Sequence, residues 1–336
     1  MPPPLLLALV AALIQLKGEL LAGGTLRGSA SIRLERASGG DTPVLTLASP
    51  GGVVRLLLDS GASSTMVTPE LAQRLGLSSR PLASDAIELA GGGSRCASLQ
   101  PRRTRLPTLE LRSEGQQGSL RLSDVEALVM PVAALPQGID GVLGIPSLRQ
   151  LPIWIDPQLN RLALGPAALS AARAAGPRAT GPRAGGPRAE GPDVSSLTIP
   201  LRWRRGVPLL QLQTPGAAVA ALADTGAEGL FLSPTLAAQL QPLGPAQVLK
   251  LAGFCGEQAV ESRRYGGLSL GGLSLGGLSL GDGGRNRGQP AAVEAIRIEN
   301  SIFAQLGIEA IVGQELLRSR AQLWRLESRP PRLELR

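Results

Sequence analysis

The sequence predicts an all-β protein of two homologous lobes, and three observations lead to this fold class. Glycine and proline are abundant, at 43 and 28 of 336 residues, whereas aromatic residues make up only 2%. This composition is typical of turn-rich β-sheets, here with cores of Leu, Val, Ile and Ala. One four-residue motif occurs twice, and further motifs follow each copy in the same order. The length suits two domains that each bury a core.

The repeated motif comes at the end of an apolar run in both halves of the chain. The first copy is Asp59-Ser60-Gly61-Ala62, after Leu56–Leu58, and the second is Asp224-Thr225-Gly226-Ala227, after Ala221–Ala223. Two aspartates in equivalent contexts are the working parts of a hydrolase with a carboxylate dyad. The question is therefore whether the surrounding sequence repeats in register.

A short helix is predicted nine residues after each aspartate. Thr68-Pro69 and Ser233-Pro234 each supply a hydroxyl N-cap and a proline at the first helical position. Gly76 then ends the first helix.

Three more features recur downstream in the same order. They are a Leu-Ala-Gly segment, an apolar-apolar-Gly segment and a tryptophan in an apolar stretch that resembles a strand. The pairs are Leu89–Gly91 with Leu251–Gly253, Val142–Gly144 with Ile311–Gly313, and Trp154 with Trp324. The chain is therefore interpreted as a tandem duplication with one aspartate in each copy.

These motifs resemble the aspartic peptidases of the pepsin and retropepsin clan, from about Gly51 to the C-terminus. The resemblance implies a bilobal pepsin-like fold, with two β-barrel-like lobes and an active-site cleft between them. Within this clan, the motifs resemble those of bacterial, specifically cyanobacterial, pepsin-like proteins, which look like a retropepsin dimer fused into one chain.

The resemblance also assigns the site residues. Asp59 and Asp224 would be the catalytic pair, holding a water between one ionised and one protonated carboxyl group. Glycine lets the backbone pass close to the carboxylates, and the hydroxyl residues would hydrogen-bond to the opposite lobe. The expected dyad support is Ser60, Gly61, Thr225 and Gly226, and the expected flap glycines are Gly91, Gly92, Gly93 and Gly253.

Alanine follows each glycine of the motif, at Ala62 and Ala227. Digestive pepsin-like enzymes usually carry a hydroxyl residue there, which would donate to the ionised carboxylate and lower its pKa. Alanine cannot donate in this way, as in the retroviral enzymes. We therefore expect a mildly acidic activity optimum.

The function that follows is an aspartic endopeptidase acting on peptide or unfolded protein substrates. Two alternatives stay open: tight turns after buried strands, and a non-catalytic peptide-binding protein on the same fold. Histidine is absent from the sequence, which removes histidine-dependent nucleophiles and imidazole metal sites. No cofactor, metal or nucleic-acid partner is expected, and the chain is expected to be a monomer. The net charge of +8 comes with a strong excess of arginine over lysine, which indicates coding bias.

The two cysteines, Cys96 and Cys255, both fall in predicted flaps. A disulfide between the flaps is conceivable, but two free and partly buried thiols are favoured, because the flaps differ in length. The only tyrosine, Tyr265, lies too far along the chain for the tyrosine of a pepsin flap.

Composition divides the chain into four parts. Residues 1–24 are a leader or export signal, 25–165 the first lobe, 166–195 a linker rich in Gly, Pro, Arg and Ala, and 196–336 the second lobe. The Leu-Ser-Leu tract at 267–281 is interpreted as an expanded loop.

The N-terminal apolar run, Leu5–Ile14, is too short for a stable membrane span. It resembles the core of a signal peptide but lacks a preceding basic residue. Both an exported or periplasmic location and a cytoplasmic one stay open. The sequence does not reveal the physiological substrate or any zymogen step.

Overall fold

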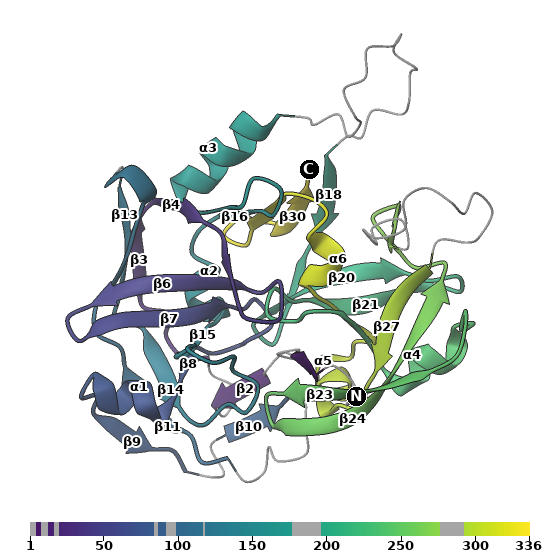
Figure 1. Cartoon of the computed structure of the whole chain (residues 1–336), viewed down its shortest axis with the longest axis horizontal. Coiled ribbons are helices and arrows are strands. Elements are labelled where there is room, and N and C mark those ends of the chain that lie inside the picture. Colours follow the sequence, from purple (N-terminus) through teal and green to yellow (C-terminus); the bar gives the residue numbers. More distant parts are fainter. Residues whose placement is uncertain are drawn as a thin grey trace.

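Two large β-sheets, each built mainly from one half of the chain, meet at the centre of the molecule, and a third sheet joins them (Figure 1). The computed structural model describes residues 5–7, 13–16, 20–83, 87–91, 99–116, 118–176, 196–275 and 292–336. For 5–7, 13–16 and 116, only the backbone is described.

The N-terminal lobe is built on a sheet with the order β3-β13-β12-β6-β7-β15-β8-β14-β11-β9, to which β5 is added beside β6. Parallel pairing of β15 with β7 brings the apolar-Gly segment beside the strand that precedes Asp59. The strands are β3 (Thr25–Gly28), β5 (Glu35–Arg36), β6 (Pro43–Ser49), β7 (Gly52–Leu58), β8 (Met66–Val67), β9 (Ser79–Pro81), β11 (Arg102–Arg105), β12 (Leu109–Arg112), β13 (Ser119–Ser123), β14 (Glu126–Val129) and β15 (Gly141–Leu143).

The C-terminal lobe is built on a sheet with the order β1-β23-β24-β27-β22-β28-β21-β20-β25-β26, to which β19 is added beside β20. Its run β20-β21-β28-β22-β27-β24 follows the same path as β6-β7-β15-β8-β14-β11 in the other lobe. The strands are β1 (Leu5–Leu7), β19 (Arg202–Arg204), β20 (Val207–Gln213), β21 (Ala218–Ala223), β22 (Leu230–Leu232), β23 (Gln247–Gly253), β24 (Gly256–Gly266), β25 (Ser269–Leu270), β26 (Leu273–Ser274), β27 (Ala292–Arg297) and β28 (Ala310–Val312).

A six-stranded sheet, β18-β30-β29-β16-β17-β4, takes strands from both halves. Its middle pair, β16 and β29, is antiparallel and sets Ile153 opposite Trp324, so backbone hydrogen bonds connect the halves. The strands are β4 (Ala30–Arg33), β16 (Ile153–Asp156), β17 (Arg161–Leu164), β18 (Leu197–Pro200), β29 (Gln322–Arg325) and β30 (Arg332–Leu335). The stretches around Trp154 and Trp324 are thus strands, as predicted.

The two predicted helices are confirmed at α1 (Pro69–Arg74) and α4 (Pro234–Gln239). The hydroxyl oxygens of Thr68 and Ser233 each accept a hydrogen bond from the backbone N–H three residues further along the chain, as an N-cap side chain does. The other short helices are α2 (Ile145–Leu148), α5 (Ser301–Leu306), α6 (Gln314–Leu317) and the 3₁₀ turn η3 (Glu114–Gln116).

Part of the predicted linker is instead a helix, α3 (Pro166–Ala175). Its face of Ala168, Ala171 and Ala172 is buried against a cluster that includes Trp154. Alanine has the highest helix propensity, and its small side chain allows a helix to pack closely on a sheet. An Ala-rich run can therefore form a helix that is buried on one face. Residues 177–195 of the expected linker lie outside the described residues.

The Leu-Ser-Leu tract also differs from the expected loop in its first part. Strands β25 and β26 form a hairpin, and β25 pairs with β20 at the edge of the sheet. Leu268, Leu270 and Leu275 are buried there, because alternation with serine gives the tract one apolar face.

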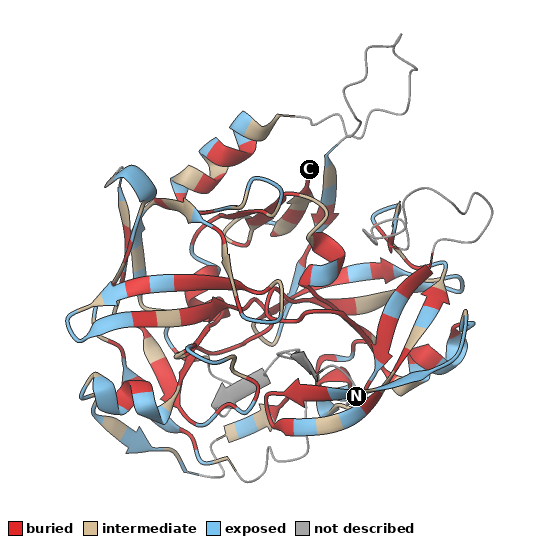
Figure 2. Cartoon of the chain, viewed as in Figure 1, coloured by how far each residue is buried: buried red, intermediate tan, exposed pale blue. Residues whose placement is uncertain are grey.

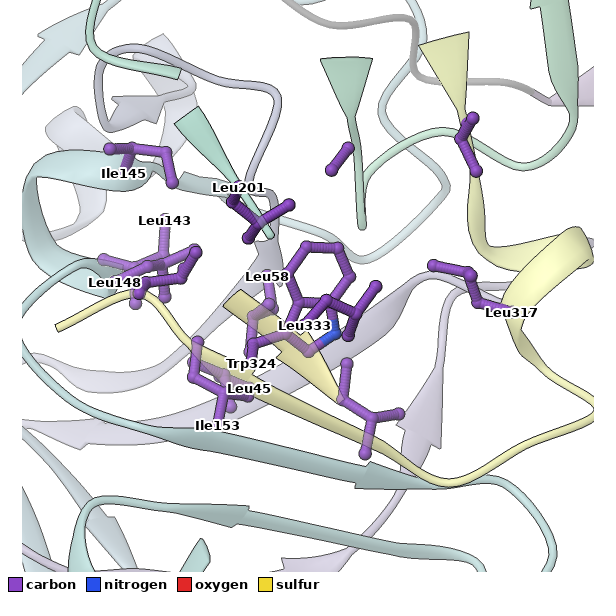
Figure 3. Close-up of a cluster of buried hydrophobic side chains, with 14 of the residues drawn as sticks. Leu45, Leu58, Leu143, Ile145, Leu148, Ile153, Leu201, Leu317, Trp324 and Leu333 are labelled. Atoms are coloured by element: carbon purple, nitrogen blue, oxygen red, sulfur yellow. The ribbon is translucent and has the colours of Figure 1, made fainter. Parts of the chain in front are cut away.

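One buried cluster continues from lobe to lobe beneath the two motifs. This cluster includes Leu58, Leu143, Trp324 and Leu333, each of which is at most 1% exposed (Figures 2 and 3). The strands that carry the aspartates therefore end on a common apolar base. Among the described residues, no helix is long and apolar enough to cross a membrane.

Candidate active site

The two aspartates stand where the central strands of the lobes end. Asp59 follows β7, and its N–H donates to the carbonyl of Leu143 on β15 at 3.2 Å. Asp224 follows β21, and its N–H donates to the carbonyl of Val312 on β28 at 3.0 Å. Each aspartate is thus fixed to the apolar-Gly segment of its own lobe.

Behind each loop, the glycine of that segment packs against backbone. A Cβ atom built at Gly144 would lie 2.5 Å from the Ser64 carbonyl oxygen, and one at Gly313 would lie 2.3 Å from that of Ala227. Real Cβ atoms do not come this close to backbone. Both segments therefore require glycine, for the same close approach.

Ser60 and Thr225 join the loops by reciprocal hydrogen bonds. The N–H of Ser60 donates to the Thr225 hydroxyl at 2.9 Å, and the N–H of Thr225 donates to the Ser60 hydroxyl at 2.9 Å. Each hydroxyl then donates to a carbonyl across the interface, Ser60 to Ala223 and Thr225 to Leu58, both at 2.8 Å. The loops are held together by four buried hydrogen bonds with two-fold symmetry.

The glycines of the motif lie against the opposite carboxyl groups. A Cβ at Gly61 would be 2.4 Å from the Asp224 carboxyl carbon, and one at Gly226 would be 2.3 Å from that of Asp59. Each loop therefore crosses directly beneath the other lobe's aspartate. The structure brings together Asp59, Asp224 and the predicted supporting residues.

The two carboxyl groups are not equivalent. Asp59 Oδ1 accepts from the N–H groups of Gly61 and Ala62 at 2.8 and 2.9 Å, whereas Asp224 Oδ1 accepts from that of Gly226 at 2.8 Å. The Oδ2 atoms of both aspartates are buried without a hydrogen-bond partner. Such atoms are a polar site for a bound water or a substrate group.

Burial dominates the electrostatics of the pair, since Asp59 and Asp224 are 1% and 0% exposed. Burial raises the pKa of Asp59 to about 6, against the lowering effect of the Asp224 carboxyl and of the two N–H donors. Burial and the neighbouring Asp59 charge hold the pKa of Asp224 well above its usual range. Two N–H groups donate to Asp59 and one to Asp224, so a pair that shares one proton favours an ionised Asp59 beside a protonated Asp224.

Glu228 forms a second link between the lobes, which sequence reasoning missed. Its carboxylate accepts from the N–H groups of Asp41 and Thr42 at 2.6 and 3.0 Å and from the Thr42 hydroxyl at 2.6 Å. Asp41 also pairs with Arg318 at 2.7 Å. Burial raises the pKa of Glu228. A carboxylate four residues after Asp224 was the available signal, but nothing in the sequence indicates its distant partners.

The predicted flaps approach each other across the lobes. The N-terminal one contains β10 (Ile87–Ala90), and a Cβ at Gly91 would lie 2.9 Å from the Phe254 ring in the turn of hairpin β23–β24. Phe254 and Ala252 are buried with N-terminal residues, and Ala90 with C-terminal ones. Gly253 pairs with Gly256 at the hairpin end. Gly92 and Gly93 lie outside the described residues.

The expectation of two free thiols is wrong for Cys255, which is disulfide-bonded. The flap lengths behind that expectation do not decide the matter, because hairpin β23–β24 packs against the other lobe. Cys96, the other cysteine of the chain, lies outside the described residues. In the described part of the chain, no three His, Cys, Asp or Glu residues are grouped as a metal site would require.

Comparison with known proteins agrees with this geometry in the N-terminal lobe. The model of the family described as aspartyl protease matches residues 46–147, which include the first aspartate loop, α1 and the first apolar-Gly segment. That stretch is thus similar to aspartyl proteases in sequence. The curated proteins give no match.

Solved structures similar to this chain include two proteases and a globulin. An aspartic proteinase from Irpex lacteus has a TM-score of 0.45 and 12% identity, covering 91% of this chain and 96% of its own. Basic 7S globulin from soybean has a TM-score of 0.46 and 10% identity, covering 91% and 94%. A retropepsin-like aspartic protease from Rickettsia conorii has a TM-score of 0.26 and 18% identity, covering 42% and 92%.

Because Gly226 lies against the opposite carboxyl group, alanine at this position should destabilise the protein, whereas alanine at an uncrowded glycine should not. Gly226→Ala should lower the melting temperature by several degrees, because its Cβ would have to displace the Asp59 carboxyl carbon. Gly216→Ala is the matched control, since a Cβ there meets nothing within 4 Å. Differential scanning calorimetry of both variants checks this. Equal melting temperatures for the two would contradict the described loop contact.

Proposed function

We propose that this protein is an aspartic endopeptidase in which Asp59 and Asp224 form one catalytic dyad. The observation that carries the proposal is the pair of unpartnered, buried Oδ2 atoms on two aspartates fixed by reciprocal contacts. A carboxylate dyad of this kind activates water for attack on an amide. The family match over residues 46–147 supports the same class of chemistry.

The unequal hydrogen bonding assigns a role to each carboxyl group. Asp59, which accepts two backbone N–H groups, is the base and takes a proton from the attacking water. Asp224, held protonated by burial and by the Asp59 charge, donates its proton to the carbonyl oxygen of the scissile bond. In the second step, the C–N bond breaks, the proton held by Asp59 passes to the leaving nitrogen, and a hydroxyl of the tetrahedral intermediate returns its proton to Asp224 as the new carboxyl group forms. Over the two steps the dyad consumes one water and ends with one proton, as it began.

Access to the dyad requires movement of the predicted flaps. The aspartates are buried, and Gly91 and Phe254 are in contact across the lobes. The ion pair between Glu88 on β10 and Arg205 of the C-terminal lobe, at 2.9 Å, is another contact that opening would break. Closure excludes water and backbone pairing then holds an extended peptide.

Both lobes contribute one aspartate loop from a single chain, so the protein resembles a fused dimer in its chemistry. We propose that residues 25–165 and 196–336 act as the two halves of one enzyme. The parallel strand order of the two large sheets supports this arrangement. A monomer then contains a complete site.

The dyad predicts complete dependence of cleavage on both aspartates. Asp59→Asn and Asp224→Asn should each lower kcat on a denatured protein by about 10²-fold or more, since each removes the general base or the general acid. Pepstatin should inhibit the unmutated chain. Asp124→Asn, at an exposed turn position with φ of 56° that asparagine tolerates, is the matched control.

The outcomes of this assay separate the two functions. Cleavage that survives in both dyad variants would rule out the proposed mechanism. Peptide binding without any cleavage by the unmutated chain, at every pH tested, would favour a peptide-binding protein.

The raised pKa of Asp59 predicts where kcat/KM falls on the acidic side of its pH profile. As the pH falls through about 6, Asp59 gains a proton and the base is lost, so kcat/KM should fall. Ala62→Ser adds a hydroxyl beside the Asp59 carboxylate, and its donation should shift this limb to lower pH. Ala168→Ser, a buried alanine in α3, should leave the limb in place. An unshifted limb in Ala62→Ser would contradict this view of position 62.

A further inference from the structure

A cavity of about 790 Å³ lies at the β4 edge of the six-stranded sheet, apart from the candidate active site. It is lined by β4, by the turn between β16 and β17, by the start of the η3 turn and by the first residues of α3. No residue of the aspartate loops or flaps belongs to this lining in the described part of the chain. The cavity is therefore a separate feature, which the proposed dyad does not use.

Helix α3 packs beside β4 and β16 and covers only part of the sheet face there (Figure 1). Ala163 on β17 is buried in one cluster with Ala168 and Ala171 of the helix. Arg161, two residues before Ala163 and hence on the same face of the sheet, is exposed. The cavity is the part of this face that the start of α3 leaves uncovered.

Two arginines lie directly opposite each other in this uncovered part. The antiparallel pairing of β4 with β17 sets Arg33 opposite Arg161, and both line the cavity. Like charges in such positions destabilise a sheet. Within the described ranges, neither arginine forms an ion pair with an acidic side chain. Glu114 is the acidic residue of the lining, and its Oε1 accepts from the backbone N–H of Arg33 at 3.1 Å.

Hydroxyl groups add further hydrogen-bond donors to the same lining. Arg161 Nε donates to the Ser31 hydroxyl at 2.8 Å, and the Ser31 N–H donates to the Ser113 hydroxyl at 3.1 Å. Both hydroxyl oxygens act as acceptors in these bonds, so their protons are available for another group. Two guanidinium groups and two hydroxyls offer more donors than the roughly four that a carboxylate accepts. A phosphate group, with three charged oxygens, matches this set better.

The rest of the lining is apolar enough to hold an organic group. Leu159 is 59% exposed at the rim, and the half-buried Ile32 and the exposed Pro166 also line the cavity. Its volume falls within the range of about 300–1,000 Å³ that is typical of small-molecule sites. An inorganic phosphate ion would leave most of this space and all of this apolar surface without contacts.

We infer that the cavity is a binding site for a small organic phosphate. Arg33 and Arg161 hold the phosphate group, and its charge offsets their mutual repulsion. The organic part of the ligand lies against Leu159 and Ile32. The inference does not rest on the proposed peptidase function, since none of these residues contributes to the dyad.

The test is isothermal titration calorimetry on the full chain, with phenyl phosphate as the probe. Inorganic phosphate and benzoate are separate arms of the experiment. Phenyl phosphate should bind about tenfold or more tightly than either, because inorganic phosphate lacks the apolar part and benzoate presents only two oxygens and one charge.

Arg33→Gln tests the role of the arginine pair. The variant should bind phenyl phosphate about tenfold or more weakly, because it loses charge-assisted hydrogen bonds. Its melting temperature without ligand should not fall, since the substitution removes one of two opposed like charges. Arg202→Gln, at an exposed arginine on β19 of the other lobe, is the matched control and should bind the probe as the unmutated chain does.

Each arm can contradict the inference. Phenyl phosphate that fails to bind at millimolar concentration, or that binds Arg33→Gln and Arg202→Gln equally well, would overturn the site. Benzoate or inorganic phosphate that binds as tightly as phenyl phosphate would overturn its assignment to an organic phosphate.

Discussion

Two hydroxyl side chains hold the centre of this molecule together, and the rest of the site depends on them. Ser60 and Thr225 each accept a hydrogen bond from the other's N–H and donate to a carbonyl of the opposite lobe. Each such bond contributes about 1 kcal/mol, but a buried group left without its partner costs about 1–3 kcal/mol. Because the four bonds form together, the loops can meet in only one register, which sets the aspartates face to face.

This junction buries the carboxyl groups of both aspartates. Burial raises the pKa values of both carboxyl groups, and the Asp59 charge raises that of Asp224 further, so the pair destabilises the fold when it ionises. The surrounding structure offsets this through the common apolar base, the six-stranded sheet and the Glu228 contact with Thr42. A local arrangement that opposes stability but suits chemistry is typical of a functional site.

Local motifs made much of the site predictable, and long-range contacts account for the rest. The aspartate loops and the helices after Thr68 and Ser233 depend on short signals that act within a few residues. Helix α3 and hairpin β25–β26 were not predicted, because the low-complexity composition of both segments is typical of unstructured chain. Their secondary structure depends instead on packing against a neighbouring sheet. The partners of Glu228 and the bonded state of Cys255 depend on residues distant in sequence.

The most direct test is the pH dependence of unfolding for the chain and for Asp224→Asn. A raised folded-state pKa means that the native pair binds more protons than the unfolded chain, so stability falls as the pH rises from about 4 through 6. Asparagine mimics the neutral acid, so the variant should gain about 1–3 kcal/mol over the unmutated chain between pH 4 and pH 7. Urea unfolding across this range measures the gap. Parallel curves would show that the two carboxyl groups do not form a buried, coupled pair.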